Sequence, residues 1–190
     1  MSLSFVHTTL GQRVLFGTGR ARENLSESVR RLNAKRLLLI HDASIVAIAD
    51  EMTVGLPIAV RIGKVSQHVP IEDVQEVQST AVASGVDAIV TVGGGSATGL
   101  AKAVALRLGL PIIAVPTTFA GSEATDVWGT TEGNKKTTGS DPAVVPAVIV
   151  YDASLSSSLP LELAFASGLN AIAHAVDGFW APRADPINTA

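Results

Sequence analysis

Residues 87–102 read DAIVTVGGGSATGLAK, and this stretch decides the fold. The run from Ala88 to Val92 is apolar and rich in β-branched side chains, which is typical of a central strand in a parallel sheet. The glycines that follow, Gly93, Gly94 and Gly95, allow backbone angles that a Cβ would forbid, and they let another molecule approach the main chain. The stretch therefore predicts a buried strand, a glycine turn and the start of a helix.

The start of this helix is a candidate anion site. Ser96 is expected to cap the helix, whose free N–H groups favour a phosphate. The alternative is a tight turn that binds nothing, but three glycines cost more chain entropy than a turn alone needs. We favour the phosphate, although the pattern is neither the Gly-x-Gly-x-x-Gly fingerprint nor a P-loop. The apolar face of the predicted helix consists of Ala97, Leu100, Ala101, Val104, Ala105 and Leu108.

The composition excludes several classes of protein. The 190 residues allow one large α/β domain, or one domain and part of another. Because the net charge is −3 and no Lys/Arg run occurs, we expect neither a nucleic acid nor an anionic membrane as partner. The absence of cysteine excludes disulfides and thiol nucleophiles. With no signal peptide and no run long enough to span a bilayer, the expected location is the cytoplasm.

Strands and helices alternate along the first part of the chain. This alternation predicts an α/β fold with an open, mostly parallel sheet and helices on both faces. The expected helices are Arg20–Leu32, Ile45–Val54, one opened by Pro70, and one after the glycines. The expected strands are Ser4–His7, Arg13–Gly17, Lys35–Ile40, Ile58–Ile62, Ala88–Val92, Leu110–Val115 and Ala147–Tyr151.

The second part of the chain has a different pattern. The polar, glycine-bearing segment Val127–Pro146 predicts a β-hairpin arm. After Pro160 the pattern is helical only, from Leu161 to Trp180. We therefore expect a nucleotide-binding α/β domain over residues 1–157 and the start of an all-helical domain over 158–190.

Polar side chains follow two of the predicted strands. Asp42 comes directly after the second buried strand, where an acidic residue commonly accepts hydrogen bonds from the adenosine ribose and repels a 2′-phosphate. An equally good interpretation makes Asp42 the N-cap of the next helix. Hydroxyl groups cluster after Val115, at the edge where open α/β sheets bind ligands, although an ordinary polar loop would look the same. These hydroxyls belong to Thr117, Thr118, Ser122 and Thr125.

Asn170 and His174 form the second candidate site. They are four residues apart on the predicted helix Leu161–Trp180, so they project from one face among small apolar neighbours. A polar pair on a buried face needs partners. A lone histidine is usually a core residue with a satisfied hydrogen bond, but the pairing with Asn170 favours an active-site role.

Four segments together resemble the iron-containing alcohol dehydrogenase superfamily. Within it, the sequence is most similar to the maleylacetate reductases, which use NADH or NADPH to reduce maleylacetate to 3-oxoadipate in the bacterial breakdown of aromatic compounds. The motifs occur in the family's order and cover nearly the whole chain. They are Gly93–Ser96 with Lys102, Pro116–Thr125, Ser158–Pro160 and Ser167–Ala175.

The resemblance implies a Rossmann-like, dehydroquinate synthase-like domain followed by an all-helical domain, with the active site between them. It also implies a pyrophosphate on Gly94, Gly95 and Ser96, and the adenosine ribose near Asp42. We expect NADH to be preferred, NADPH to be accepted as well, and the enzyme to be a homodimer that acts on a small dicarboxylate. The predicted cofactor-binding residues are Asp42, Gly93, Gly94, Gly95, Ser96, Thr117, Thr118, Ser122 and Thr125.

The chain departs from the metal-dependent members of the superfamily at Gly99 and Asn170, where those proteins usually carry Asp. A neutral amide is a poor ligand for a divalent cation, so we expect no bound metal. Family members are also longer, with further histidines beyond the position of Ala190, so we expect an N-terminal portion of the enzyme. His174 is the candidate proton donor or holder of a substrate carboxylate. The alternatives are a metal-dependent alcohol or polyol dehydrogenase and a non-catalytic nucleotide-binding module.

Overall fold

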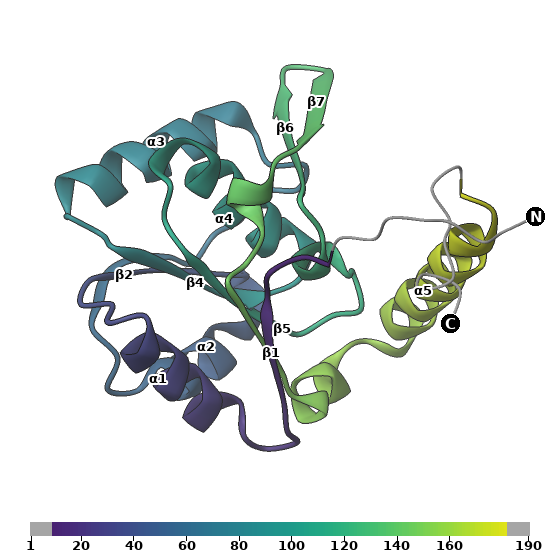
Figure 1. The fold of residues 1–190 in the computed structure, drawn as a ribbon, viewed down its shortest axis with the longest axis horizontal. Coiled ribbons are helices and arrows are strands. Elements are labelled where there is room, and N and C mark those ends of the chain that lie inside the picture. The colour runs from purple at the N-terminus through teal and green to yellow at the C-terminus, as the bar shows by residue number, and fades with distance from the viewer. Residues whose placement is uncertain (1–8, 182–190) are drawn as a thin grey trace, which may run out of the picture.

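The computed structural model describes residues 9–181, so the strand expected at Ser4–His7 lies outside the described residues. Its centre is a six-stranded, parallel sheet in the order β1-β8-β5-β4-β2-β3 (Figure 1). The predicted open parallel sheet is confirmed. Its strands are β1 (Arg13–Phe16), β2 (Leu37–His41), β3 (Ile58–Ile62), β4 (Ala88–Gly93), β5 (Ile112–Pro116) and β8 (Val148–Tyr151).

Helices cover both faces of the sheet (Figure 1). One face packs against α1 (Ala21–Arg31) and α2 (Val46–Thr53), and the other against α3 (Ile71–Ala83) and α4 (Gly95–Leu108). Successive residues of a strand point to opposite faces, so β2 places Leu39 in one core and Ile40 in the other. Because both faces are covered, every residue of β2, β4 and β5 is buried, as their continuous apolar runs predict.

Two helix starts differ from the sequence prediction. The helix α4 begins at Gly95 with Gly94 as N-cap and no side-chain cap, so the predicted capping role of Ser96 is wrong. The reason is that the helical conformation begins one residue earlier, which places Ser96 inside the first turn. Pro70 is the N-cap of α3 rather than its first residue. A short 3₁₀ turn, η1 (Ala43–Ile45), precedes α2.

The predicted hairpin arm is confirmed as β6 (Val127–Glu132) and β7 (Lys135–Ser140), which stand away from the main sheet (Figure 1). Thr131 joins the arm to the body of the domain. Its backbone N–H donates to the Val69 carbonyl at 3.0 Å, and its hydroxyl donates to the His68 carbonyl at 2.8 Å. The arm is therefore anchored to the turn that precedes α3.

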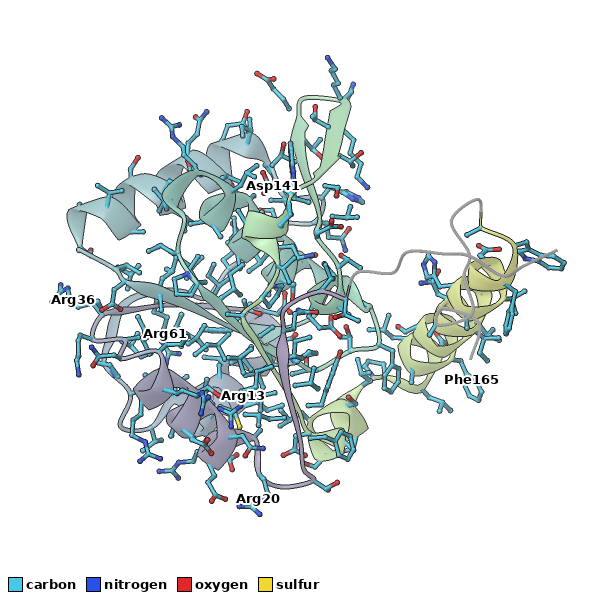
Figure 2. The ribbon with its side chains drawn as sticks, viewed as in Figure 1. Arg13, Arg20, Arg36, Arg61, Asp141 and Phe165 are labelled. Carbon is cyan, nitrogen blue, oxygen red and sulfur yellow. The ribbon has the colours of Figure 1, made fainter. Side chains whose placement is uncertain are left out.

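The last described helix, α5 (Leu161–Trp180), has the bounds that the sequence predicts and follows the 3₁₀ segment η4 (Ala153–Ser158). It stands apart from the sheet, and none of its residues is buried (Figure 1). Phe165, for example, projects outward and is 65% exposed (Figure 2). None of the helices in residues 9–181 combines the length and apolar character needed to cross a bilayer.

Candidate cofactor-binding site

Three neighbouring strands end at one edge of the sheet and bring Asp42, the glycine turn, Thr117 and Thr118 together there. β4 lies between β2 and β5, with His41 paired to Val92 and Gly93 paired to Pro116. Asp42 therefore emerges on one side of the glycine turn and Thr117 on the other. The Thr117 N–H donates to the Gly93 carbonyl at 3.0 Å, which fixes the loop after β5 against the turn. Open α/β sheets bind ligands at such carboxyl edges.

Steric crowding explains why glycine occupies each of the three positions in the turn. Gly93 has φ +154°, and a Cβ there would lie 2.5 Å from the Asp42 Oδ2. A Cβ on Gly94 would lie 3.0 Å from the Thr118 Cγ2, and one on Gly95 would lie 3.3 Å from the Ala120 Cβ. The turn therefore lets β2, α4 and the loop after β5 approach one another more closely than side chains would permit.

The first turn of α4 presents backbone N–H groups that have no partner inside the helix. Its first intrahelical hydrogen bond runs from the Thr98 N–H to the Gly94 carbonyl at 3.1 Å. The N–H groups of Gly95, Ser96 and Ala97 come before that bond, so the helix leaves them free to donate. Together with the positive end of the helix dipole they suit an anion such as a phosphate.

Asp42 does not act as a helix cap. It occupies the N-cap position of η1, but its side chain makes no capping hydrogen bond. Instead its Oδ2 accepts a hydrogen bond from the Gly94 N–H at 3.0 Å. The carboxylate is thus held at the glycine turn, which removes the capping interpretation. Its contact with a ribose stays a prediction.

The hydroxyl-bearing loop after β5 has two parts. Thr117 and Thr118 lie against the glycine turn, and Thr117 is buried. Ser122 begins the short turn η2 (Ser122–Ala124) and Thr125 follows it, and the Thr125 hydroxyl donates to the Ser122 carbonyl at 3.1 Å. The hydroxyl of Thr125 is therefore engaged within the protein, and the contacts of Ser122 and Thr125 with a cofactor stay predictions.

Lys102 is a functional candidate that sequence reasoning missed, although it lies in the quoted motif. Its side chain is fully buried, and the three N–H groups of its Nζ are shared among four oxygens of the loop after β5 and the start of β6. Burial lowers the pKa of Lys102 to about 8, against the opposing charges of Glu123 and Asp126. A lysine among the alanines of a buried helix face was the signal available in the sequence.

Glu123 braces the same loop from the other side. Its Oε1 accepts from the Tyr151 hydroxyl at 2.9 Å, and its carbonyl accepts from the Gln12 side chain at 2.8 Å. Burial, followed by the charge and hydrogen bond of Glu123, raises the pKa of Tyr151. A pocket of about 260 Å³ opens here and is lined by residues that include Thr118, Glu123 and Tyr151. The loop between β5 and β6 is therefore held on two sides.

The family model described as iron-containing alcohol dehydrogenase matches residues 11–153. This chain belongs to the iron-containing alcohol dehydrogenase family. The match covers the sheet, the glycine turn and the loop that Lys102 and Glu123 hold, which confirms the resemblance seen in the motifs.

The chain is similar to maleylacetate reductases and to a further iron-containing alcohol dehydrogenase of known structure. Maleylacetate reductase from Pseudomonas sp. (strain P51) is 42% identical over 97% of this chain and 53% of its own length. The crystal structure of maleylacetate reductase from Rhizobium sp. strain MTP-10005 matches with TM-score 0.92 and 39% identity, over 98% of this chain and 53% of that one. An iron-containing alcohol dehydrogenase structure from Corynebacterium glutamicum matches with TM-score 0.96 and 45% identity, over 98% and 52%. The chain thus spans about half the length of these relatives.

In this member of the iron-containing alcohol dehydrogenase family, Asn170 and His174 lie away from the glycine turn. Both are exposed on α5, and no hydrogen bond in residues 9–181 links either of them to that edge (Figure 1). The described part of the chain contains no group of three or more His, Asp or Glu side chains placed to hold a metal ion. The imidazole of His174 suits iron or zinc, but together with the neutral amide of Asn170 it offers a metal only two ligands. The catalytic roles of Asn170 and His174 stay predictions.

Proposed function

We propose that this chain holds the nicotinamide cofactor of a reductase that acts on maleylacetate. The observation that carries the proposal is the set of free N–H groups at the start of α4, with the Asp42 carboxylate on one side and Thr117 on the other. Similarity to several maleylacetate reductases supports the substrate. The bound nicotinamide would supply the hydride that reduces maleylacetate to 3-oxoadipate.

The residues at the glycine turn fit a dinucleotide. The N–H groups of Gly95, Ser96 and Ala97 would hold the pyrophosphate, since the Gly94 N–H is already engaged by Asp42. The Asp42 carboxylate would accept hydrogen bonds from the adenosine ribose while it keeps the Gly94 N–H. A 2′-phosphate placed beside this carboxylate would be repelled, so NADH should be preferred and NADPH accepted less well.

The substrate side of the site rests on α5. His174 would donate a proton or hold a substrate carboxylate, and Asn170 would hydrogen-bond to the substrate. A dicarboxylate substrate needs several cationic or N–H partners, because charge-assisted hydrogen bonds are the strong ones. We propose that the reaction uses no metal, because an amide at Asn170 replaces the carboxylate that a divalent cation favours. The same residue disfavours the metal-dependent alcohol dehydrogenase alternative.

Cofactor binding is tested by titrating the chain with NADH and following the fluorescence of the nucleotide. Gly95→Asp should raise the Kd for NADH at least about a hundredfold, because it places a negative charge where the pyrophosphate would lie. Gly11→Asp is the matched control, since Gly11 has no other heavy atom within 4 Å of its Cβ position and lies before β1. An unchanged Kd in Gly95→Asp would remove the glycine turn from the cofactor site.

The substrate is tested with the whole protein by following the loss of NADH absorbance after maleylacetate is added. We expect maleylacetate-dependent oxidation that a chelator does not affect. Turnover of a small alcohol that a chelator abolishes would instead identify a metal-dependent alcohol dehydrogenase. Saturable NADH binding without turnover of either substrate would identify a nucleotide-binding module. The homodimer and the cytoplasmic location stay predictions, which mass measurement in solution and cell fractionation would check.

A further inference from the structure

We propose that the ammonium group of Lys102 acts as a built-in monovalent cation that positions the cofactor-binding loop between β5 and β6. We further propose that the oxygen cage around it accepts a free ammonium ion when the side chain is removed. The role of the loop in cofactor binding rests on the function proposed above. The cage itself stands on contacts within the protein.

The cage consists of oxygen atoms from one short segment. Lys102 Nζ lies 2.5 Å from the Ser122 carbonyl oxygen, 2.7 Å from that of Thr125 and 2.9 Å from that of Val127. The fourth oxygen is the Thr125 hydroxyl, at 3.0 Å. Three backbone carbonyls and a hydroxyl therefore surround one charged donor, and hydrogen bonds from an ionised donor are the strong ones. Lys102 belongs to α4, so its ammonium group links this helix to the segment Ser122–Val127.

The charges near the cage do not form an ion pair with Lys102. Glu123, which is 5% exposed, directs its Oε1 to the Tyr151 hydroxyl. The Oδ2 of Asp126 accepts from the Ser140 hydroxyl at 2.7 Å. No salt bridge among residues 9–181 involves Lys102. The ammonium group is therefore held by neutral oxygens, with the two carboxylates acting only from a distance.

An uncharged side chain at position 102 would not hold the loop between β5 and β6 in place. A buried carbonyl that loses a donor is destabilising, and an aliphatic replacement would remove the Lys102 hydrogen bond from three carbonyls, of which that of Ser122 keeps the Thr125 hydroxyl as a donor. The segment Ser122–Val127 would then move outward to reach water. The same loop places Thr118 and Ala120 against Gly94 and Gly95. Movement at one end of the loop would therefore loosen the wall of the glycine turn at the other end.

The test compares Lys102→Ala, which empties the cage, with Lys102→Met, whose side chain has similar length and fills it without charge. Both variants should raise the Kd for NADH about tenfold or more. Adding ammonium chloride should restore affinity and raise the melting temperature of Lys102→Ala in a saturable way. Tetramethylammonium chloride at equal ionic strength should not, because it has no N–H to donate. Lys102→Met and the wild type should respond to neither salt.

Two results would overturn the proposal. One is a Lys102→Met protein that binds NADH within about twofold of the wild type. The other is a Lys102→Ala protein that responds equally to both salts. If Lys102→Ala fails to fold in buffer, refolding it with and without ammonium gives the same decision, because the proposal requires ammonium-specific recovery. If the wild type binds no NADH, the cofactor proposal fails, while the response of the melting temperature to ammonium still decides the cage.

Discussion

Helices α4 and α5 are both rich in small apolar residues, but α4 is buried in the domain and α5 is exposed. α4 is packed between the sheet, α3 and the hairpin arm, and eight of its residues are buried. α5 has a longer apolar sequence and no buried residue. Large side chains such as Leu169 and Ile172 are more than half exposed there. An apolar face shows that a helix needs a partner, but the partner must be supplied by other elements.

The same difference separates the two candidate sites. Around the start of α4, the contacts among β2, β4 and the loop after β5 hold each polar group in place. Around Asn170 and His174, nothing in residues 9–181 supplies a second wall. The candidate cofactor-binding site therefore has a defined geometry, whereas the proposed substrate site is defined only by one helix face. Four predictions would break or sharpen this contrast.

The largest effect is expected at the turn before α4. Gly93→Ala should lower the free energy of unfolding by about 3 kcal/mol or more, because its Cβ would clash with the Asp42 carboxylate and its φ of +154° is strained. Gly109→Ala, at φ +66° with nothing near its Cβ position, should cost only about 1 kcal/mol. Urea unfolding measures both. Equal losses would show that strain, and not the close approach of β2, requires the glycine.

The next effect compares one substitution on the two helices. Leu100→Ala in α4, where the side chain is 2% exposed, should cost about 2–5 kcal/mol because it leaves a cavity. Leu169→Ala in α5, where the side chain is 65% exposed, should change the unfolding free energy by less than about 0.5 kcal/mol. The pair is measured by urea unfolding of the chain. A large loss in Leu169→Ala would show that α5 packs on a partner in solution.

Asp152 links the end of β8 to the segment that leads into α5, and it should have an intermediate effect. Its carboxylate accepts hydrogen bonds from the N–H groups of Gly19, Ala21 and Ser154 and from the Ser154 hydroxyl. Burial acts to raise the pKa of Asp152, but these hydrogen bonds outweigh it, so the pKa lies below its usual value. Asp152→Asn should therefore cost about 2 kcal/mol at neutral pH.

The pH dependence of that loss follows from the sign of the shift. Because the pKa is lower in the folded state, the stabilisation by Asp152 is complete above the ordinary aspartate pKa. It is lost as the pH falls through the lower, folded value. Unfolding measured from neutral to strongly acidic pH should show the wild type and Asp152→Asn converging in acid. A difference that stays constant with pH would assign the loss to packing.

The smallest effect is expected on cofactor choice. Asp42→Ala should reduce the preference for NADH over NADPH by about fivefold, or about 1 kcal/mol, because it removes the charge that repels a 2′-phosphate. Competition titrations with the two nucleotides measure the ratio. Asp42→Asn keeps the size of the side chain and separates charge from volume. If the ratio of NADH to NADPH affinity is unchanged in both variants, Asp42 does not select the cofactor, and its role is limited to the hydrogen bond with the Gly94 N–H.

Most of the fold could be predicted because its signals are local. The continuous apolar runs of β2, β4 and β5 indicated buried parallel strands, and β3 and α5 have the predicted bounds. The helix starts at Gly95 and Ile71 were missed because caps depend on backbone angles that neighbouring elements set. The competing interpretations of Asp42 could not be separated either, since the distance to the Gly94 N–H depends on the pairing of β2 with β4.

The sequence by itself determined the α/β class, the strand-turn-helix unit and the family, because periodicity and glycine content act over a few residues. Only the tertiary structure decided which polar groups face the turn and which ones brace it. Lys102 is next to alanines in the chain, but its four oxygen partners are at least 20 residues away. A charge can be buried only where donors and acceptors from different elements come together, and the local sequence around Lys102 does not show which distant residues will supply them.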